Sequence, residues 1–514
     1  MKSESFSFVE RRLTLKRFIS IMLSVFMLLA LCACSSGDSS TESQSESSAV
    51  VSGDSTSQAT SEEESKTESA GDSSSEATSE EVSDDDGIID DAAYEQFQKV
   101  SKVDGTLAER GFKDKGANSD YVPLNYDTMK AMWICQFDFG SVYCSGSGQR
   151  SEGQFRAYVE KAYDNLVSMG FNTVIVQTRP NADSFYPSAY YPWSHYILGS
   201  YGKSATYDPL EIMIEEAHER KLSFQAWINP MRGMSPANLN KINGAYPLQV
   251  WKNDTKKADY LYEYNGLLYL NIAYEEVRKL IIDGAAELVR NYDIDGVHMD
   301  DYFYFGEEKA FDKKAFDSAR RKNATLTLKT FRFNNLNTLV SGIYSAIKEE
   351  NKNVIFGISP AGNLDSMATK YYADVNTWLS QDGYVDYIMP QIYFGMEHQT
   401  WSFTYTYNRW SAIVKNPNIK FMPGITYLKA IDGAAGIGDT YAGTGANEWI
   451  ENKDVMKRCL EFAVAQDNFA GFALFSYNEL WDPITGKEVT SIKEEIDNSK
   501  IFYTDIIKGE PIKY

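Results

Sequence analysis

The chain has 514 residues, 50 basic and 72 acidic, and a formal net charge of −22. This length exceeds one ordinary domain, so segments that are removed or remain unfolded have to be identified first. The acidity argues against nucleic acid and against an anionic membrane surface as partners, because both require a basic patch.

The N-terminus has the features of an export signal. Four basic residues between Arg11 and Arg17 precede the apolar run Phe18–Ala33, which is short for a membrane span. The run ends in Leu31-Cys32-Ala33-Cys34, which resembles a bacterial lipobox. We predict a lipoprotein signal peptide over residues 1–33 and lipidation of Cys34, which would anchor the protein at the extracellular face of the bacterial cell membrane. An ordinary secretory signal is the alternative.

Residues 34–91 are predicted to be a disordered acidic linker. The stretch Ser35–Asp91 contains 17 acidic residues and one lysine, so about −16 of the net charge lies there. Such a composition buries too little apolar surface to offset the entropy of ordering. The linker would act as a spacer above the membrane. Residues 92–128 are interpreted as a lead-in segment, with a strand that closes the barrel floor as one interpretation.

The rest of the chain, residues 129–514, alternates short β-rich runs with segments of helical period, which predicts strand-helix units around a parallel sheet. Eight such runs favour the α/β class and a (β/α)8 TIM barrel; a doubly wound open sheet is weaker, because no Gly-rich phosphate loop follows the first run. The predicted strands are Lys130–Phe137, Asn172–Arg179, Ser223–Pro230, Gly296–Phe303, Val354–Pro360, Val385–Phe394, Lys420–Tyr427 and Gly471–Tyr477. The predicted helices are Gln154–Met169, Tyr207–Arg220, Glu275–Asn291 and Leu336–Glu350.

Three long insertions follow strands three, four and seven, over Met231–Leu268, Phe303–Arg332 and Ala430–Asn447. Asn265-Gly266 predicts a β-hairpin with a two-residue turn in the first of them. All three leave the C-terminal ends of strands, the face where barrel enzymes place their chemistry.

The number and spacing of cysteines and histidines limit which disulfide bonds and metal sites the chain can form. Beyond the signal, Cys135, Cys144 and Cys459 form no disulfide framework, although a bond between Cys135 and Cys144 stays open. The four histidines show no zinc-binding spacing. We therefore expect no metal and no cofactor, which argues against a metal-dependent amidohydrolase barrel.

Polar and aromatic side chains cluster at the predicted C-terminal strand ends. Amides donate to and accept from sugar hydroxyls, aromatic faces stack on sugar rings, and unpartnered burial of so many polar groups would be costly. The candidate ligand is thus a polysaccharide or other glycan. The candidate substrate-binding residues are Asp138, Gln177, Arg179, Asn229, Trp227, His298, Tyr302, Asn363, Gln391, Tyr393 and Tyr427. Further candidate stacking rings are Trp133, Tyr186, Tyr190, Tyr191, Trp193, Tyr304, Trp401 and Trp481.

From about Lys130 to Trp481 the chain also resembles the bacterial glycoside-hydrolase-like family 10 proteins, the DUF187 group of secreted barrels. The matching segments are Val176–Asp183, Ala226–Pro230, Gly296–Tyr304, Phe356–Pro360, Asp386–Tyr393 and Gly471–Tyr477. One departure is Phe331-Arg332-Phe333, where the family pattern has Trp-Arg-Arg, and we expect it to affect packing. The resemblance implies a TIM-barrel glycosidase-like domain and leaves the substrate open.

Asp300, Asp301 and Glu479 are the candidate catalytic residues for glycoside hydrolysis, which needs an acid and a second carboxylate. Neighbouring carboxyls raise one pKa, so one of the two aspartates would stay protonated near neutral pH. In one version Asp300 stabilises the substrate and Asp301 is the acid, while an N-acetyl group attacks. In the other, one aspartate works with Glu479 across the mouth.

Several of these residues have a structural alternative. His298 is either a structural histidine or a proton shuttle. Arg179 either binds a sugar carboxylate or phosphate, or pairs with Asp183 or Asp138. Glu479 either takes part in catalysis or caps the segment before Trp481. The alternative function is a tethered carbohydrate-binding lipoprotein without hydrolytic activity, which would manage with amides and aromatic rings alone.

Overall fold

The computed structural model describes residues 118–146, 148–242, 244–300, 303–305, 308–504 and 510–514. The predicted signal peptide, lipidation at Cys34, the acidic linker and the first part of the lead-in lie outside these residues. Within the described ranges, no helix is long and apolar enough to cross a membrane.

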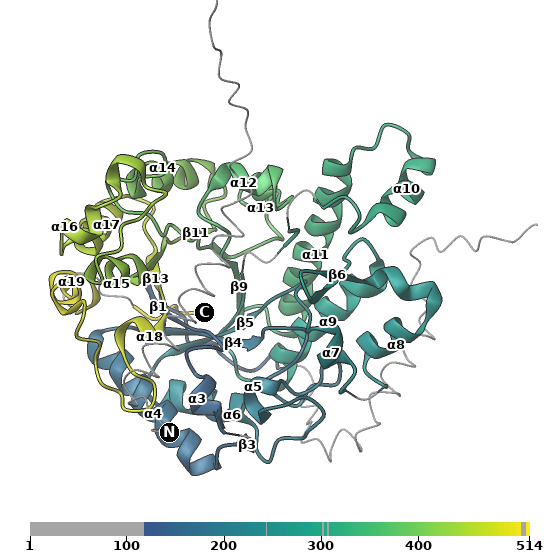
Figure 1. The fold of residues 1–514 in the computed structure, drawn as a ribbon, viewed down its shortest axis with the longest axis horizontal. Helices are drawn as coiled ribbons and strands as arrows, with labels where there is room; N and C mark the ends of the chain where they lie inside the picture. The colour runs from purple at the N-terminus through teal and green to yellow at the C-terminus, as the bar shows by residue number, and fades with distance from the viewer. Residues whose placement is uncertain (1–117, 147, 243, 301–302, 306–307, 505–509) are drawn as a thin grey trace, which may run out of the picture. The chain divides into compact units, whose positions relative to one another are not determined.

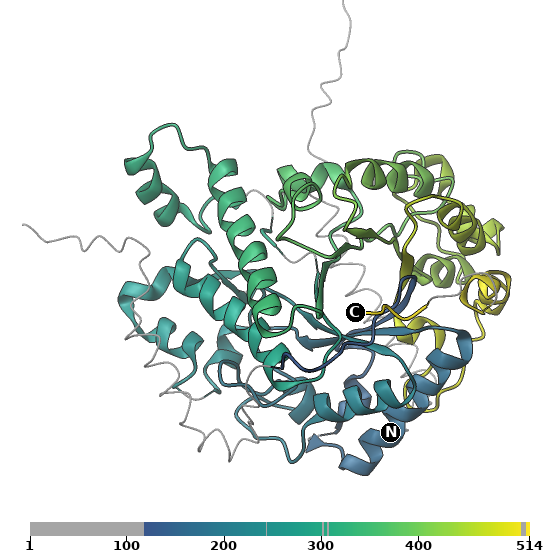
Figure 2. The same cartoon turned by 180° about the vertical axis from the view of Figure 1, so that it is seen from behind.

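A parallel sheet forms the centre of the protein, and it curls into a ring (Figures 1 and 2). Its strand order is β11-β10-β9-β8-β5-β4-β1-β13-β12. These strands are β1 (Met129–Ile134), β4 (Thr173–Arg179), β5 (Ser223–Ile228), β8 (Gly296–Met299), β9 (Ile355–Ile358), β10 (Tyr387–Ile388), β11 (Lys420–Phe421), β12 (Gly424–Thr426) and β13 (Gly471–Phe475). Each lies within one of the eight predicted runs, except that β1 begins one residue earlier, at Met129.

The ring is closed, because β11 and β12 are two halves of one strand. β11 pairs with β10 and β12 pairs with β13, and only Met422-Pro423 separates the halves. Proline has no N–H for the ladder, which explains the break. Gln391 bridges Gly424 and continues the contact between strands six and seven. The predicted eight-stranded barrel is therefore confirmed, and the open doubly wound sheet is excluded.

Helices surround the ring and follow the strands in the expected alternation (Figure 1). The longer ones are α4 (Glu152–Met169), α6 (Pro209–Glu219), α9 (Glu275–Asn291), α10 (Lys313–Lys322), α11 (Leu328–Glu350), α14 (Phe403–Ile413) and α17 (Val455–Val464). Short helical segments are α3 (Gly140–Tyr143), α5 (His195–Leu198), α7 (Pro236–Leu239), α8 (Pro247–Asn253), η2 (Thr255–Tyr260), α12 (Leu364–Thr369), α13 (Val375–Trp378), α15 (Leu428–Ala434), η3 (Gly443–Gly445), α16 (Glu448–Glu451), α18 (Tyr477–Leu480), α19 (Lys493–Ser499) and α20 (Ile501–Thr504).

Capping residues set the ends of the predicted helices. The Ser151 side chain accepts from Gln154 N at the start of α4, and Gly170 ends that helix in the left-handed region. Asp208 caps α6 ahead of a proline, within the predicted helix Tyr207–Arg220. The start predicted for α11 is wrong by two turns, because Thr327 provides an N-cap upstream.

The insertion after β5 contains the predicted hairpin. β6 (Leu261–Tyr264) pairs antiparallel with β7 (Leu267–Leu270), and Tyr264 lies opposite Leu267. Asn265 and Gly266 both have positive φ, +48° and +77°, as a type I′ turn requires. A second short pair, β2 (Cys144–Ser145) with β3 (Gly148–Gln149), lies after β1.

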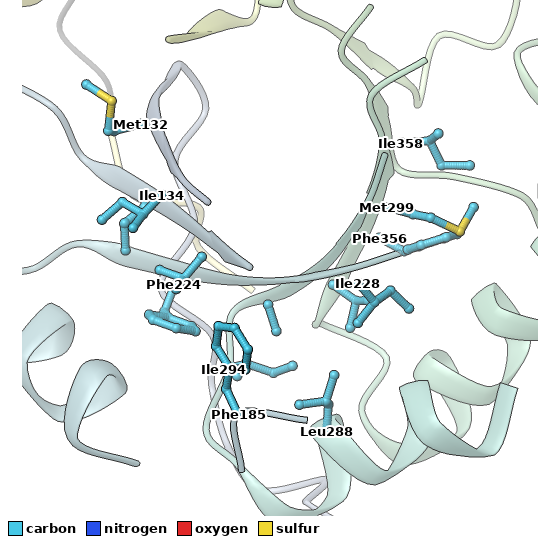
Figure 3. Close-up of a cluster of buried hydrophobic side chains, with 14 of the residues drawn as sticks. Met132, Ile134, Phe185, Phe224, Ile228, Leu288, Ile294, Met299, Phe356 and Ile358 are labelled. Atoms are coloured by element: carbon cyan, nitrogen blue, oxygen red, sulfur yellow. The ribbon is translucent and has the colours of Figure 1, made fainter. Parts of the chain in front are cut away.

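Alternate residues of each strand build two cores. Outward-facing side chains pack against the helices: Figure 3 shows Met132, Phe224, Met299 and Phe356 directed away from the ring interior, with Leu288 of α9 beneath them. Inward-facing side chains fill the interior with Met129, Ala131, Trp133, Cys135, Ile175, Trp227, Tyr387, Met389, Met422 and Ala473. The barrel is a packed core and not a pore.

The described part of the lead-in covers the N-terminal end of the barrel around Asp295. Its carboxylate accepts hydrogen bonds from the Tyr121 hydroxyl (2.6 Å), Leu124 N (2.5 Å) and Phe224 N (2.6 Å). Tyr126 forms an isolated antiparallel bridge to Pro511. The lead-in therefore closes the floor as irregular chain that is anchored on one carboxylate, and residues 118–128 contain only this bridge in place of a strand.

Replacing Gly357 by alanine is expected to destabilise the barrel by about 3 kcal/mol or more, as overpacking of a dense core does. A Cβ there would lie 2.0 Å from Cζ of Tyr387, and that ring is held by its hydrogen bond to His298. Gly153→Ala is the control: a Cβ at this exposed α4 position meets nothing within 4 Å, so stability should be unchanged or slightly raised. Urea denaturation measures both, and a Gly357→Ala loss below about 1 kcal/mol would contradict the prediction.

Candidate active site

Three neighbouring strand ends place Asn229, Asp300 and Ser359 side by side at the C-terminal face. Ile228 is paired with Met299, and Met299 with Ile358, so the residues that follow them share one level. Strand alternation directs all three inward, as for Trp227 and His298 two residues earlier. Neighbouring strands are about 4.8 Å apart, which brings an amide, a carboxylate and a hydroxyl together at the barrel mouth.

The Asp300 carboxylate is held from below by the indole of Trp227. Trp227 Nε1 donates to Asp300 Oδ2 at 3.1 Å. Both side chains are largely buried, at 2% and 6% exposure. We predicted that Trp227 stacks on substrate; the structure uses its polar edge to orient Asp300 instead. Asp301 and Tyr302, the other predicted residues of this segment, lie outside the described residues.

Within the described residues, Asn229 and Ser359 carry buried polar atoms that have no protein partner. Gln177 Nε2 donates to Asn229 Oδ1 at 2.6 Å, which fixes the amide and leaves Asn229 Nδ2 without an acceptor. The Ser359 hydroxyl has no partner either. A buried polar atom left unpaired costs free energy, so these two groups are suited to bind ligand hydroxyls. Ser359 was missed from the sequence, where it is one serine in a strand that ends in proline.

Glu479 and Asp138 lie across the mouth from Asp300. β8 and β13 are the fourth and eighth of the eight ring positions, hence opposite. Glu479 accepts from the Thr426 hydroxyl (2.8 Å) and from Tyr427 N (2.6 Å). Asp138 accepts from Cys135 N (2.8 Å) and the Ser476 hydroxyl (2.9 Å). Both carboxyls therefore tie neighbouring strand ends together.

Burial changes the protonation of these two carboxyls. It raises the pKa of Glu479 well above its usual value, and the charge of Asp138 raises it further. Burial also raises the pKa of Asp138, to about 6, against the hydrogen bonds from Cys135 and Ser476. Burial thus favours the protonated form of Glu479 more than it would for an exposed glutamate, against the hydrogen bonds from Thr426 and Tyr427.

Asp138 is expected to make stability pH-dependent. Its pKa in the folded state, about 6, lies above the ordinary 3.8, so the folded state binds the proton more tightly. The stabilisation is present below about pH 4 and is lost as pH rises through about 6. In Asp138→Asn this loss should be absent, so the difference in Tm between the variant and the wild type should change between about pH 4 and pH 6. Parallel curves from pH 4 to 7 would contradict the assignment.

His298 lies one layer below the mouth and is a structural residue, which corrects its predicted role in substrate binding. Trp133 Nε1 donates to His298 Nε2 (3.2 Å), so the ring proton is on Nδ1 and donates to the Tyr387 hydroxyl (2.8 Å). Burial lowers the pKa of His298 to about 3. The ring is fully buried, neutral and bonded at both nitrogens, which also excludes a proton shuttle.

Arg179 points outward, because a register shift interrupts β4 between Gln177 and Arg179. Its guanidinium donates to the Tyr191 hydroxyl (2.7 Å) and packs beside Gly284 of α9. It forms no ion pair with Asp183 or Asp138, so that predicted alternative is wrong as well. Tyr427 directs its hydroxyl away from the mouth, to Ser499 and to Tyr503 (2.6 Å) in the C-terminal helices. The prediction that Arg179 and Tyr427 lie at the mouth is therefore wrong for both residues.

Asn363, Gln391 and Tyr393 lie on the rim after β9 and β10, and all three are half-buried. Asn363 Oδ1 caps α12 by accepting from Asp365 N (3.0 Å), and Gln391 Nε2 donates to Ser359 O (3.2 Å). Tyr393 packs against Phe475, with ring centroids 6.0 Å apart. These placements agree with the predicted position at the mouth.

Most of the predicted stacking rings are packing residues. Trp133, Tyr186, Tyr191, Trp193, Tyr304 and Trp481 are buried, whereas Tyr190 and Trp401 are half-buried. The structure reveals another aromatic group, in which Phe305 of the loop after β8 packs on hairpin residues Tyr264 (4.7 Å) and Tyr269 (4.4 Å). This contact joins the β6–β7 hairpin to the loop that carries Asp300.

Cys135 and Cys144, whose pairing the sequence left open, are free thiols, as is Cys459. Among the described residues, no group of three or more acidic, histidine or cysteine side chains is arranged to hold a metal ion.

Residues 128–442, more than half of the chain, match the family described as Glycosyl hydrolase-like 10. Glycosyl hydrolase YngK of Bacillus subtilis (strain 168) is 38% identical over 308 residues, covering 56% of this chain; this chain spans only 58% of that protein. Glycosyl hydrolase DigH of Escherichia coli (strain K12) is 28% identical over 389 residues, with coverage of 71% and 86%. The PgaB (BpsB) glycoside hydrolase domain from Bordetella bronchiseptica superposes with a TM-score of 0.44 at 10% identity, over 70% of this chain and 95% of that domain. Asp300 lies inside the family match and Glu479 beyond it.

Proposed function

This chain belongs to the Glycosyl hydrolase-like 10 family, and on that premise we propose that it hydrolyses glycosidic bonds of a cell-wall or extracellular polysaccharide. The observation that carries the proposal is the arrangement of polar side chains at the mouth of the barrel. Asp300 lies between the unpartnered donors Asn229 Nδ2 and Ser359 Oγ. Glycoside hydrolysis uses a pair of carboxyl groups together with hydrogen bonds to sugar hydroxyls, and Asp300 with these two donors would supply one carboxylate and the hydroxyl contacts.

In the proposed mechanism Asp300 stabilises positive charge that develops at the sugar ring. Trp227 holds its carboxylate in place, so little reorganisation accompanies the reaction. The acid is Asp301 or, across the mouth, Glu479, whose pKa burial raises well above its usual value. Asn229 and Ser359 orient the sugar through hydroxyls. Export and lipidation at Cys34 would place this site outside the cell, above the membrane.

The proposal is tested by incubating the protein with purified peptidoglycan and a panel of exopolysaccharides and measuring released reducing ends. The comparison is Asp301→Asn, which keeps size and removes the charge. Release by the wild type that this variant lacks would support hydrolysis. Equal release by both would exclude Asp301 as the acid and leave Glu479, and release by neither would refute hydrolysis. Retention of a polymer without release would identify the carbohydrate-binding alternative. Full activity in EDTA is expected, and its loss would reopen metal-dependent chemistry.

A further inference from the structure

A pair of packed aromatic rings, one exposed and one half-buried, lies beside the mouth at the start of α14. The rings belong to Trp401 and Tyr405, and together with Arg409 we call them the α14 platform. The Trp401 and Tyr405 rings are 6.0 Å apart between centroids, and Tyr405 is 48% exposed. The Arg409 guanidinium lies 5.6 Å from the Trp401 ring centroid and 5.5 Å from that of Tyr405. Single exposed apolar side chains are ordinary on a protein surface, whereas adjoining rings held in one arrangement offer a flat face on which a sugar ring can pack.

The platform is held in place from three sides. Arg409 donates to both oxygens of Asp365, at 3.0 and 2.5 Å. Trp401 N donates to Nδ1 of the buried His398 at 3.0 Å. The Ser402 hydroxyl accepts from Tyr405 N at the N-cap. The backbone contacts fix the chain on which the two rings stand, and Arg409, itself held by Asp365, packs over both rings, which lowers the entropy that a ligand would have to remove on binding.

The platform is continuous with the rim of the mouth. Asp365 lies in the first turn of α12, two residues after rim residue Asn363. Trp410 of α14 donates from Nε1 to Gly362 O at 2.7 Å, which fixes α14 to the same loop. α12 and α14 lie together at one edge of the ring in Figure 1. A chain bound at Asp300 and leaving over Asn363 therefore meets these rings.

Resting on the proposed function, we infer that the α14 platform is a subsite for a sugar of the same polysaccharide chain, beyond the sugars at the cleavage point. The ligand it fits is the uncharged face of a pyranose ring. Asp365 occupies the guanidinium of Arg409 bidentately, which leaves that group unavailable for an anionic substituent. Arg409 instead lies over both rings and holds them together.

The test is affinity electrophoresis in gels that contain soluble mannan, xylan or starch, together with co-sedimentation with purified peptidoglycan. The Trp401→Ala/Tyr405→Ala double variant should bind the retarding polymer about tenfold more weakly, which corresponds to about 1.4 kcal/mol. Tyr158→Ala is the matched control. Arg150 stacks on that ring at 5.1 Å, but Tyr158 belongs to α4, well separated from α14 (Figure 1). Its binding should equal that of the wild type.

Binding is read without hydrolysis, so the platform and the proposed activity can fail independently. If a polymer is cleaved but the double variant binds it as the wild type does, the platform inference is overturned and the hydrolase proposal stands. If a polymer is bound through the platform but never cleaved, the platform inference stands and the hydrolase proposal is overturned. A wild type that none of these polymers retards or sediments also overturns the inference. Matching thermal unfolding curves confirm that the variants are folded.

Discussion

Asp300→Asn is expected to lower kcat by about 10²- to 10⁴-fold, the range for loss of a positioned acid-base or charge-stabilising group. Asparagine keeps the size of the side chain, and its oxygen still accepts from Trp227 Nε1, a contact of 3.1 Å in the wild type. Polymer binding should therefore remain close to that of the wild type. What is lost is the negative charge that the transition state needs. Steady-state kinetics on a cleaved polymer separates the two effects.

Two controls sharpen this result. Asp497→Asn removes an exposed carboxylate that pairs with Lys493 on α19, and it should leave kcat unchanged. Trp227→Phe keeps a ring below Asp300 but removes its donor. We expect about a tenfold loss of kcat, which corresponds to one hydrogen bond. An Asp300→Asn enzyme with more than about a tenth of wild-type kcat would remove Asp300 from the chemistry.

Arg332→Met is expected to reduce the free energy of unfolding by about 3–5 kcal/mol, because it leaves a buried carboxylate without its partner. Arg332 of α11 donates to both oxygens of Asp312, at 2.8 and 2.7 Å, and both side chains are at most 1% exposed. The guanidinium also lies 4.9 Å from the ring centroid of Tyr304. This residue therefore anchors the segment that follows Asp300, so the variant should lose activity as well as stability.

The matched control for this prediction is Lys313→Met, which breaks the exposed pair with Asp317 on α10. Such pairs contribute about 0.5 kcal/mol or less. The double variant Arg332→Met/Asp312→Leu should recover most of the lost stability, because no buried charge then remains. Chemical denaturation measures all three. A loss below about 1 kcal/mol for Arg332→Met, or no recovery in the double variant, would contradict the assigned role.

Arg332 is the residue of Phe331-Arg332-Phe333 that keeps the family pattern Trp-Arg-Arg, and it lies between Tyr304 and Tyr372 with Asp312 as its partner. That the departing residues Phe331 and Phe333 affect packing stays a prediction. Tyr304 itself was proposed as a stacking ring for sugars. The structure buries the Tyr304 ring against the Arg332 guanidinium. The ring is therefore not open to a sugar.

Arg179, His298 and Tyr427 were wrongly predicted to bind substrate at the mouth, each for a different physical reason. A register shift after Gln177 turns the Arg179 side chain from the inner to the outer side of the barrel. No residue type at that position predicts the shift. His298 was correctly placed on the inward face of β8, but its depth along the barrel axis depends on which strands pair with it. Tyr427 ends its strand and turns to meet Ser499 and Tyr503, more than 70 residues later in the chain.

The sequence by itself determined the strand-helix alternation, the hairpin turn at Asn265-Gly266 and the polar strand ends, because these depend on local periodicity, capping and turn chemistry. It also singled out Asp300. Only the tertiary structure decided that Trp227 orients this carboxylate, that Ser359 stands beside it and that Glu479 lies opposite. Those relations arise from strand register and ring closure, which bring together residues more than 50 positions apart. Periodicity within one strand carries no information about its neighbour's register.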